Sequence, residues 1–416
     1  VQDPWAQWQP APQHEELTAT LSRSMSGFVG SPVATDADVM EAIRRSLEDS
    51  GGQGAVPNSP FEDQMLQAIA QSLKEEDPVY KTLPRTLSVA GEVQACDIRE
   101  MRRDQLQPSE LGIWSLQRSE SATGALMLPD LSAHPTHIRD AVLSQLCDDF
   151  LAKEAERLGI LNWCHGCSRL LVVQTLGDGN CLCHAASLQQ WGIHDRDELL
   201  RSCIQRTMTT MSEAATLLKQ RHSAVLHRDR GAVGLSTSAT DIATEWEADT
   251  TVFAVSERMR DHYLGKTHVF VLANVLRRPI IVYGDDTAIE AGLAGVYLPL
   301  LWSPPQCSPT PVLVLFHGSH FSSLALDWTQ GDVLVPLSIR SRQLPLQFLT
   351  PDEAAQPREQ VLGKWLQLRR TSHPTHTGPA ELMALVPGGA RQDTLAAMLQ
   401  SAFVKQIATQ LNSRRS

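Results

Sequence analysis

Hydrophobic positions are sparse in the first quarter of the chain and become regular after it. Residues 1–124 are polar and broken by turn-rich stretches such as GGQGAVPNSP (51–60), which predicts a mostly disordered arm with short helices. From Asp140 to Leu161 apolar residues recur at about 3.6-residue spacing, which predicts one long amphipathic helix. A packed domain is therefore expected over about 125–370.

Short apolar runs and helical segments intermix through this domain. The run LLVVQTL (170–176) predicts a buried strand, and GDGN (177–180) ends it before a helix that starts at Cys181. Residues 196–262 are expected to be helical around a loop at 228–239. Further predicted elements are a short helix from 268, strands at 280–283, 296–301, 311–317 and 320–327, and an amphipathic helix at 393–411 in a tail over 371–416. Because no regular βαβ rhythm exists, the fold class is α+β or mixed α/β.

Composition narrows the classes of partner. The 416 residues carry a net charge of −11, which argues against nucleic acid and anionic membranes and favours a protein partner with a basic face. The chain contains no apolar run of 18 or more residues, so no transmembrane helix is predicted. Eight cysteines in so long a chain do not form a disulfide-framework pattern, so a reducing cytoplasmic or nuclear setting is expected.

The junction before Cys181 has the features of a nucleophile site. Gly177 and Gly179 allow a tight turn, and a cysteine on the first helical turn lies at the positive end of the helix dipole, which favours thiolate. Backbone amides of the same turn can stabilise an oxyanion. A cysteine nucleophile needs a base from elsewhere in the chain, and His320, at a strand end, is a candidate.

Several stretches resemble, in the same order, the ovarian-tumour (OTU) family of cysteine deubiquitinases, and specifically its Cezanne subgroup. They are LNWC (161–164), TLGDGNCLCHAASLQQWGIHDRDELLR (175–201), HVFVLANVLRRPIIV (268–282), AGVYLPLLW (294–302) and HFSSLAL (320–326). The resemblance implies a papain-like domain with a small central sheet flanked by helices, which cleaves ubiquitin conjugates.

The resemblance also implies roles for individual residues. Cys181 matches the nucleophile and His320 the general base. The position two residues after the histidine is Ser322, a poor substitute for the acid or amide of many OTU enzymes. In the Cezanne subgroup the acid comes from the preceding helix, where Asp148 matches and Asp149 is the competing choice. The oxyanion hole matches the backbone of Asp178, Gly179, Asn180 and Cys181, and the reaction needs no metal or other cofactor.

Cys164 and Cys167 form a CxxC pair around His165. A zinc knuckle needs a second pair of ligands, and none has suitable spacing, so these cysteines are interpreted as structural or incidental. Cys183 is expected to point into the core.

Two segments of the arm share one pattern. Residues 36–49 and 61–77 both read apolar-x-x-Ala-x-x-x-Ser-x-x-acid after a run of acids, which places Ala and Ser on one helix face. The pattern resembles the ubiquitin-interacting motif (UIM), and residues 15–25 resemble a degenerate third copy. Short solvated helices or docking segments for another partner are the alternative. The implied ubiquitin-binding residues are Val39, Ala42, Ile43, Ser46, Leu47, Met65, Ala68, Ile69, Ser72 and Leu73.

Together these features predict an enzyme that captures ubiquitin chains with tandem motifs and cleaves them with a cysteine protease domain. The expected partners are ubiquitin and polyubiquitin. One alternative is a ubiquitin-binding adaptor whose protease-like domain is weak or inactive. A protease for a ubiquitin-like modifier is the other.

Overall fold

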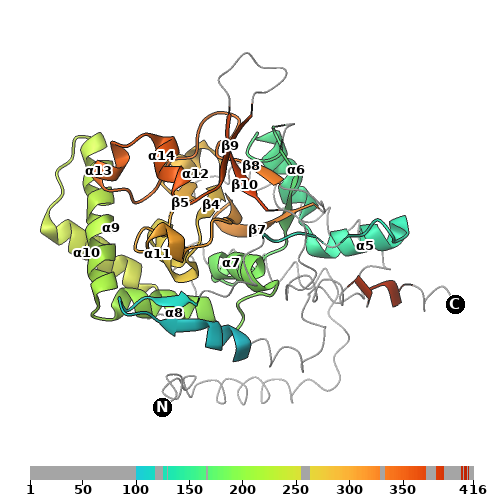
Figure 1. Cartoon of the computed structure of the whole chain (residues 1–416), viewed down its shortest axis with the longest axis horizontal. Helices are drawn as coiled ribbons and strands as arrows, with labels where there is room; N and C mark the ends of the chain where they lie inside the picture. Colours follow the sequence, from blue (N-terminus) through green and yellow to red (C-terminus); the bar gives the residue numbers. More distant parts are fainter. Residues whose placement is uncertain are drawn as a thin grey trace, which may run out of the picture. The chain divides into compact units, whose positions relative to one another are not determined.

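The computed structural model describes residues 100–117, 125–128, 130–164, 167–253, 263–327, 333–371 and 381–387, and six residues between 404 and 411 (Figure 1). The predicted ubiquitin-binding segments at 15–25, 36–49 and 61–77 lie outside these residues. Within the described part of the chain, no helix combines the length and the apolar character that a bilayer span requires.

A five-stranded mixed sheet forms the centre of the domain. Its strand order is β3-β7-β6-β4-β5, with β4 and β6 parallel and the other neighbours antiparallel. Val, Ile and Leu dominate these strands because both faces of the sheet are covered, and most of their side chains are fully buried. The strands are β3 (Leu170–Val173), β4 (Ile280–Tyr283), β5 (Gly295–Tyr297), β6 (Val312–His317) and β7 (His320–Leu326).

Helix α7 (Cys181–Trp191) packs against β6 and β7, and all of its residues are buried (Figure 1). α8 (Leu199–Thr209) contacts both α7 and α11 (Lys266–Leu276), which is itself apolar nearly all round. α9 (Glu213–Ala232) and α10 (Ala239–Thr251) pack on one another and on α8. Within residues 196–253 the predicted helical middle is confirmed, the loop predicted at 228–239 is limited to 233–238, and residues 254–262 of the prediction lie outside the described residues.

A second, three-stranded antiparallel sheet extends the domain past the predicted end at residue 370. Its order is β8-β10-β9, and its core residues join the cluster under the main sheet. The strands are β8 (Val333–Pro336), β9 (Leu368–Thr371) and β10 (Glu381–Val386). Two short helices, α13 (Pro351–Ala354) and α14 (Arg358–Gly363), lie between β8 and β9, and a third, α12 (Asp286–Glu290), lies between β4 and β5.

The folded unit also begins before residue 125, the predicted start of the domain. Residues 100–105 are helical, and β1 (Leu106–Pro108) pairs with β2 (Trp114–Leu116). Leu106 and Ile113 are fully buried, and β2 contacts α8 and α11. Isolated hairpins are marginal in water, so this segment depends on packing against helices that follow it by about a hundred residues.

The helix expected over 140–161 is two helices, α5 (Thr136–Leu146) and α6 (Asp149–Arg157). Between them Cys147 is extended and forms a bridge with Val173, and the Asp148 N–H donates to the Val172 carbonyl at 2.8 Å. Periodicity alone does not reveal this break, because apolar spacing continues through it. The break leaves Asp148 as the N-cap of α6.

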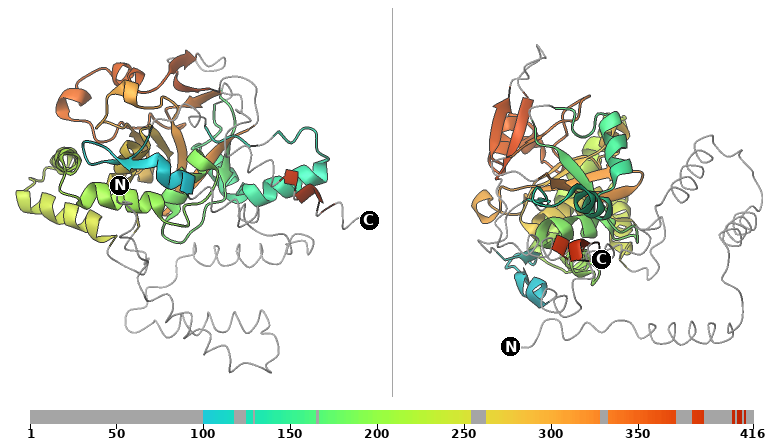
Figure 2. Two further views of the ribbon diagram at one scale, coloured as in Figure 1. Left: turned by 60° about the horizontal axis from the view of Figure 1, so that its bottom comes forward. Right: turned by 90° about the vertical axis from the view of Figure 1, so that its right-hand side faces the viewer.

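The C-terminal turn packs beside α5, as the red segment in Figure 2 shows. Val404, Ile407 and Leu411 are buried in one cluster with the apolar face of α5. Their i, i+3, i+7 spacing is that of a helix with one buried face, and residues 393–403 of the predicted tail helix lie outside the described residues.

Candidate active site

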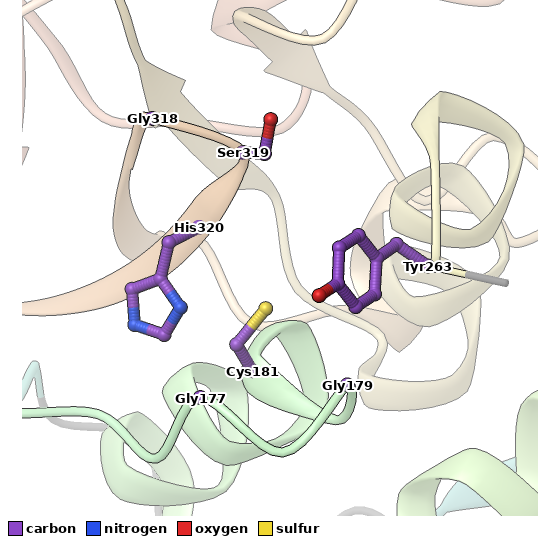
Figure 3. Close-up of a pocket in the computed structure, with 7 residues that line it drawn as sticks. All are labelled: Gly177, Gly179, Cys181, Tyr263, Gly318, Ser319 and His320. Carbon is purple, nitrogen blue, oxygen red and sulfur yellow. The ribbon is translucent and has the colours of Figure 1, made fainter. Parts of the chain in front are cut away.

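A pocket of about 470 Å³ opens between the start of α7 and the turn that joins β6 to β7. It brings together the two residues singled out in the sequence, Cys181 and His320. In Figure 3 the Cys181 sulfur lies between the His320 imidazole and the ring of Tyr263. The remaining lining residues are Gly177, Gly179, Gly318 and Ser319.

Cys181 is the first residue of α7, directly after a turn that requires glycine. Gly179 has φ of +81°, a left-handed conformation that disfavours other residues. Backbone N–H groups of Phe321, Leu182 and Cys181 face the sulfur. The thiol is only 7% exposed, so reagents reach it through the pocket.

Burial raises the pKa of the Cys181 thiol, and the three backbone N–H groups that face it lower the pKa by less. The environment predicted from the helix dipole, one that favours thiolate, is therefore not found in the free protein. The free energy needed to remove the thiolate from water exceeds the stabilisation that the backbone N–H groups provide. A neutral thiol with an adjacent base is the resting state that these groups favour.

His320 begins β7, opposite His317 in the register of the β6–β7 hairpin. Burial lowers the pKa of its imidazole. The Thr175 backbone carbonyl accepts a hydrogen bond from the ring, and the Asp148 carboxylate acts on it electrostatically; both raise the pKa. A neutral imidazole with one N–H held by a carbonyl leaves its other nitrogen able to accept a proton.

Asp148 and Asp149 occupy different environments. Asp148 is half-buried, and its Oδ1 accepts the Leu151 N–H at 2.9 Å. Asp149 is exposed on the first turn of α6. Asp148 and Asp178, and not Asp149, are among the charges that raise the pKa of His320, so Asp148 remains the predicted acid from the helix α6.

Buried side chains hold the loop before Cys181 in place. Arg201 from α8 is 6% exposed and donates to the Gly179 carbonyl at 3.3 Å and to the Val252 carbonyl at 3.0 Å. The Asn180 N–H donates to Asp178 Oδ1 at 3.0 Å. The predicted oxyanion hole is therefore corrected at Asn180, because the Asp178 carboxylate already occupies that amide.

A histidine one turn into α7 supports the same loop. His184 is fully buried, and its Nε2 lies 3.0 Å from the Asp178 Oδ1 that accepts the Asn180 N–H. His194 packs edge-on against His184, with ring centroids 5.3 Å apart. Burial lowers the pKa of His194 to about 4. One carboxylate oxygen thus ties the loop to the helix that carries the nucleophile.

Sequence reasoning missed several of these groups. His184 carries a local signal, since it is three residues after Cys181 and lies on the same side of the helix. Arg201, Tyr263 and the Thr175 carbonyl carry none, because only the tertiary structure brings them to the pocket.

The CxxC pair lies apart from the pocket-lining residues. Cys164 is buried, and the Cys167 Sγ is 3.5 Å from the Met383 Sδ of β10. Cys183 is fully buried, which confirms that it points into the core. Among the described residues, no group of three or more histidine, cysteine or acidic side chains is arranged to hold a metal ion.

Residues 176–321, which include Cys181 and His320, match the family described as OTU-like cysteine protease. The chain is 30% identical to mouse tumor necrosis factor alpha-induced protein 3 over 250 residues, 55% of this chain and 32% of that protein. It is 27% identical to the human protein of that name over 308 residues, 69% and 39% of the two chains. It is 26% identical to Drosophila melanogaster ubiquitin thioesterase trabid over 332 residues, 74% and 41%.

The chain thus spans between about a third and two fifths of the length of the curated relatives it matches. The family match, together with the mixed sheet and its flanking helices, confirms the predicted OTU-type papain-like fold and the cysteine-protease class of the domain.

Proposed function

We propose that this chain is a deubiquitinase. Its OTU-like cysteine protease domain has one nucleophile-and-base pair in the described pocket, Cys181 with His320. It hydrolyses isopeptide bonds of ubiquitin and polyubiquitin. The observation that carries the proposal is that one pocket holds both residues, one from the start of α7 and one from the start of β7. The printed name of the Drosophila relative, a ubiquitin thioesterase, supports ubiquitin as the substrate.

The first half of the reaction forms an acyl-enzyme. The His320 imidazole takes the thiol proton of Cys181 as the sulfur attacks the carbonyl carbon of the C-terminal glycine of ubiquitin. The imidazolium then gives that proton to the leaving lysine amine, and the C–N bond breaks. Because burial raises the pKa of Cys181 and lowers that of His320, proton transfer accompanies attack rather than preceding it.

The second half releases ubiquitin. His320 takes a proton from a water molecule, which attacks the thioester carbon, and the C–S bond breaks as the proton returns to sulfur. The backbone N–H of Cys181, which faces the sulfur, is suited to stabilise the oxyanion in both halves. Asp148 stabilises the imidazolium that forms in each half, the role of the acid in a Cys-His-Asp arrangement.

The subgroup of the domain and the function of the arm are inferred from the sequence. The stretches that resemble OTU enzymes support membership of the Cezanne subgroup. The repeated Ala–Ser pattern supports tandem UIMs that capture ubiquitin chains before the domain cleaves them. Weak sites in tandem raise the effective concentration of chain at the pocket. The cysteine composition supports a cytoplasmic or nuclear location.

Covalent capture by ubiquitin that carries a C-terminal electrophile tests the proposal. Wild type should form one adduct at Cys181, and Cys181→Ala should form none. Matched probes made from ubiquitin-like modifiers should react at least tenfold more slowly. No adduct with any probe, together with ubiquitin binding through residues 36–77, would replace the proposal with the adaptor function.

A further inference from the structure

The segment before the family-matched region carries a buried arginine. Arg102 lies in the helical residues 100–105 and is 1% exposed. The family match begins at residue 176, so this side chain lies outside it. A buried guanidinium is retained only where it is paired, and its partners show what it holds in place.

Arg102 contacts the far end of the helix that carries the nucleophile. Its guanidinium stacks over the ring of Trp191, the last residue of α7, 4.7 Å from the ring centroid. Gln105, one turn on, accepts a hydrogen bond from the Trp191 indole N–H at 2.9 Å. The helical segment at 100–105 is thus joined to the C-terminal end of α7 at two points.

Arg102 is also connected to the N-terminal end of α7, through the acidic residue Asp195. One guanidinium nitrogen pairs with Asp195 Oδ1, and the other donates to Asp197 Oδ1 at 2.9 Å. Asp195 is fully buried and also accepts the Leu200 N–H at 3.1 Å. Burial raises the pKa of Asp195, and Arg102 opposes this. Arg102 is therefore the cation that faces this buried carboxyl group.

Asp195 in turn holds the residue that precedes the nucleophile. The Asn180 side-chain amide donates to the Asp195 backbone carbonyl at 3.1 Å and lies 3.5 Å from its carboxylate Oδ2. Asn180 is fully buried and is the N-cap position of α7, immediately before Cys181. Arg102 is therefore connected to Cys181 by its ion pair with Asp195, by the hydrogen bond from the Asn180 side-chain amide to Asp195, and by the peptide bond that joins Asn180 to the nucleophile.

We propose that Arg102 is a positioning residue for the nucleophile, holding the end of α7 through Trp191 and its start through Asp195 and Asn180. The inference rests on the proposed function of Cys181. It makes the segment 100–117 part of the catalytic unit rather than of the arm. A shift of about 1 Å in a reacting group can cost about a hundredfold in rate, so such a support affects turnover more than substrate binding.

Two variants test the support. Arg102→Met keeps the alkyl stack on Trp191 and removes the charge, and Arg102→Met/Asp195→Asn removes both charges, so that a buried unpaired acid does not itself unfold the protein. Both should lower kcat for di-ubiquitin about ten- to a hundredfold with KM within about twofold. The matched control is Arg206→Met, which loosens the same segment at Trp114, where the guanidinium lies 4.5 Å from the ring centroid.

Alkylation by iodoacetamide, mapped by mass spectrometry, gives a readout that does not involve ubiquitin. In the double variant Cys181, normally 7% exposed, should react at least threefold faster, while the buried Cys164, which lies apart from the pocket, stays protected. Wild-type rates of alkylation and turnover in the double variant would overturn the inference, as would equal turnover losses in Arg206→Met. Parallel exposure of Cys164 would overturn it too, because it would show that the pair supports the whole fold.

The same pair of assays separates this inference from the proposed function. If wild type forms no adduct with the ubiquitin electrophile, the deubiquitinase proposal fails. Faster alkylation of Cys181 in the double variant, with Cys164 protected, would still show that Arg102 holds the loop before the cysteine.

Discussion

The loop before Cys181 is held by buried polar side chains from several elements, whereas His320 stands beside a two-residue turn that faces solvent. On the cysteine side, Arg201 donates a hydrogen bond to the Gly179 carbonyl. The carboxylate of Asp178, which also contacts His184, accepts the backbone N–H of Asn180. On the histidine side, Gly318 and Ser319 are exposed, and the ring is oriented by the Thr175 carbonyl and the acid at the start of α6.

This difference separates two kinds of sensitivity. A buried polar group that loses its partner costs about 1–3 kcal/mol, so changes on the cysteine side should reduce stability and turnover together. The histidine side relies on a hairpin register and a helix cap, both of which survive conservative changes. There, conservative changes should alter the pH dependence of activity and shift stability by no more than about 1 kcal/mol.

The largest effect is expected from Arg201→Ala. The change leaves the Gly179 and Val252 carbonyls buried without their donor, and the turn before Cys181 loses its contact with α8. We expect about 3 kcal/mol lower stability and roughly a hundredfold lower kcat/KM. Urea unfolding and di-ubiquitin cleavage measure the two. Arg201→Lys, which retains a charge and one donor, should fall between; full activity in Arg201→Ala would show that the turn is held without it.

Asp148→Asn should lower kcat/KM at least about tenfold while leaving stability nearly unchanged, because asparagine caps a helix about as well as aspartate. Burial holds the pKa of His320 below its ordinary value of 6.5, and Asp148 raises it. Activity needs the neutral imidazole, so it declines as pH falls through that pKa, and the variant should move the decline to lower pH.

The matched variant Asp149→Asn distinguishes the two candidate acids. It changes an exposed side chain on the first turn of α6. A pH–rate profile of each variant, measured as kcat/KM, decides between them. A larger loss in Asp149→Asn than in Asp148→Asn would assign the role to Asp149.

Acid should weaken the cysteine side through His194. Burial lowers the pKa of this histidine to about 4, against 6.5 in the unfolded chain, so the unfolded state binds the proton first. The contribution of His194 to the free energy of unfolding is therefore fully present above pH 6.5 and falls by about 3 kcal/mol as pH drops to 4. Urea titrations of wild type, His194→Gln and the exposed-site control His227→Gln measure it; only His194→Gln should flatten the slope.

The smallest effect concerns the turn beside His320. Ser319 has φ of +62°, a left-handed conformation that serine tolerates poorly and asparagine tolerates better. Ser319→Asn should therefore raise the free energy of unfolding by about 0.5 kcal/mol, and Gly318→Ala, at φ of +55°, should lower it by about 1 kcal/mol. Urea unfolding measures both, and a gain in Gly318→Ala would contradict the assignment of strain.

The features of this protein that depend on residues close together in the chain could be predicted from the sequence. Apolar runs followed by glycine located β3 and β6, the apolar run after Gly318 located β7, and the turn at 177–180 located the start of α7. Such features depend on neighbours within a few residues, so a single chain reports them. The same holds for Cys181 and His320 as candidates, since each lies at the end of a recognisable element.

What only the tertiary structure decided involves partners far apart in the chain. The break at Cys147 and Asp148 arises from pairing with β3, which interrupts a helical pattern that is continuous in sequence. Arg102 meets Asp195 across 93 positions, and segment 100–117 folds only because α8 and α11 cover it. A charged residue carries no local sign that it will be buried, because burial depends on what the rest of the chain packs around it.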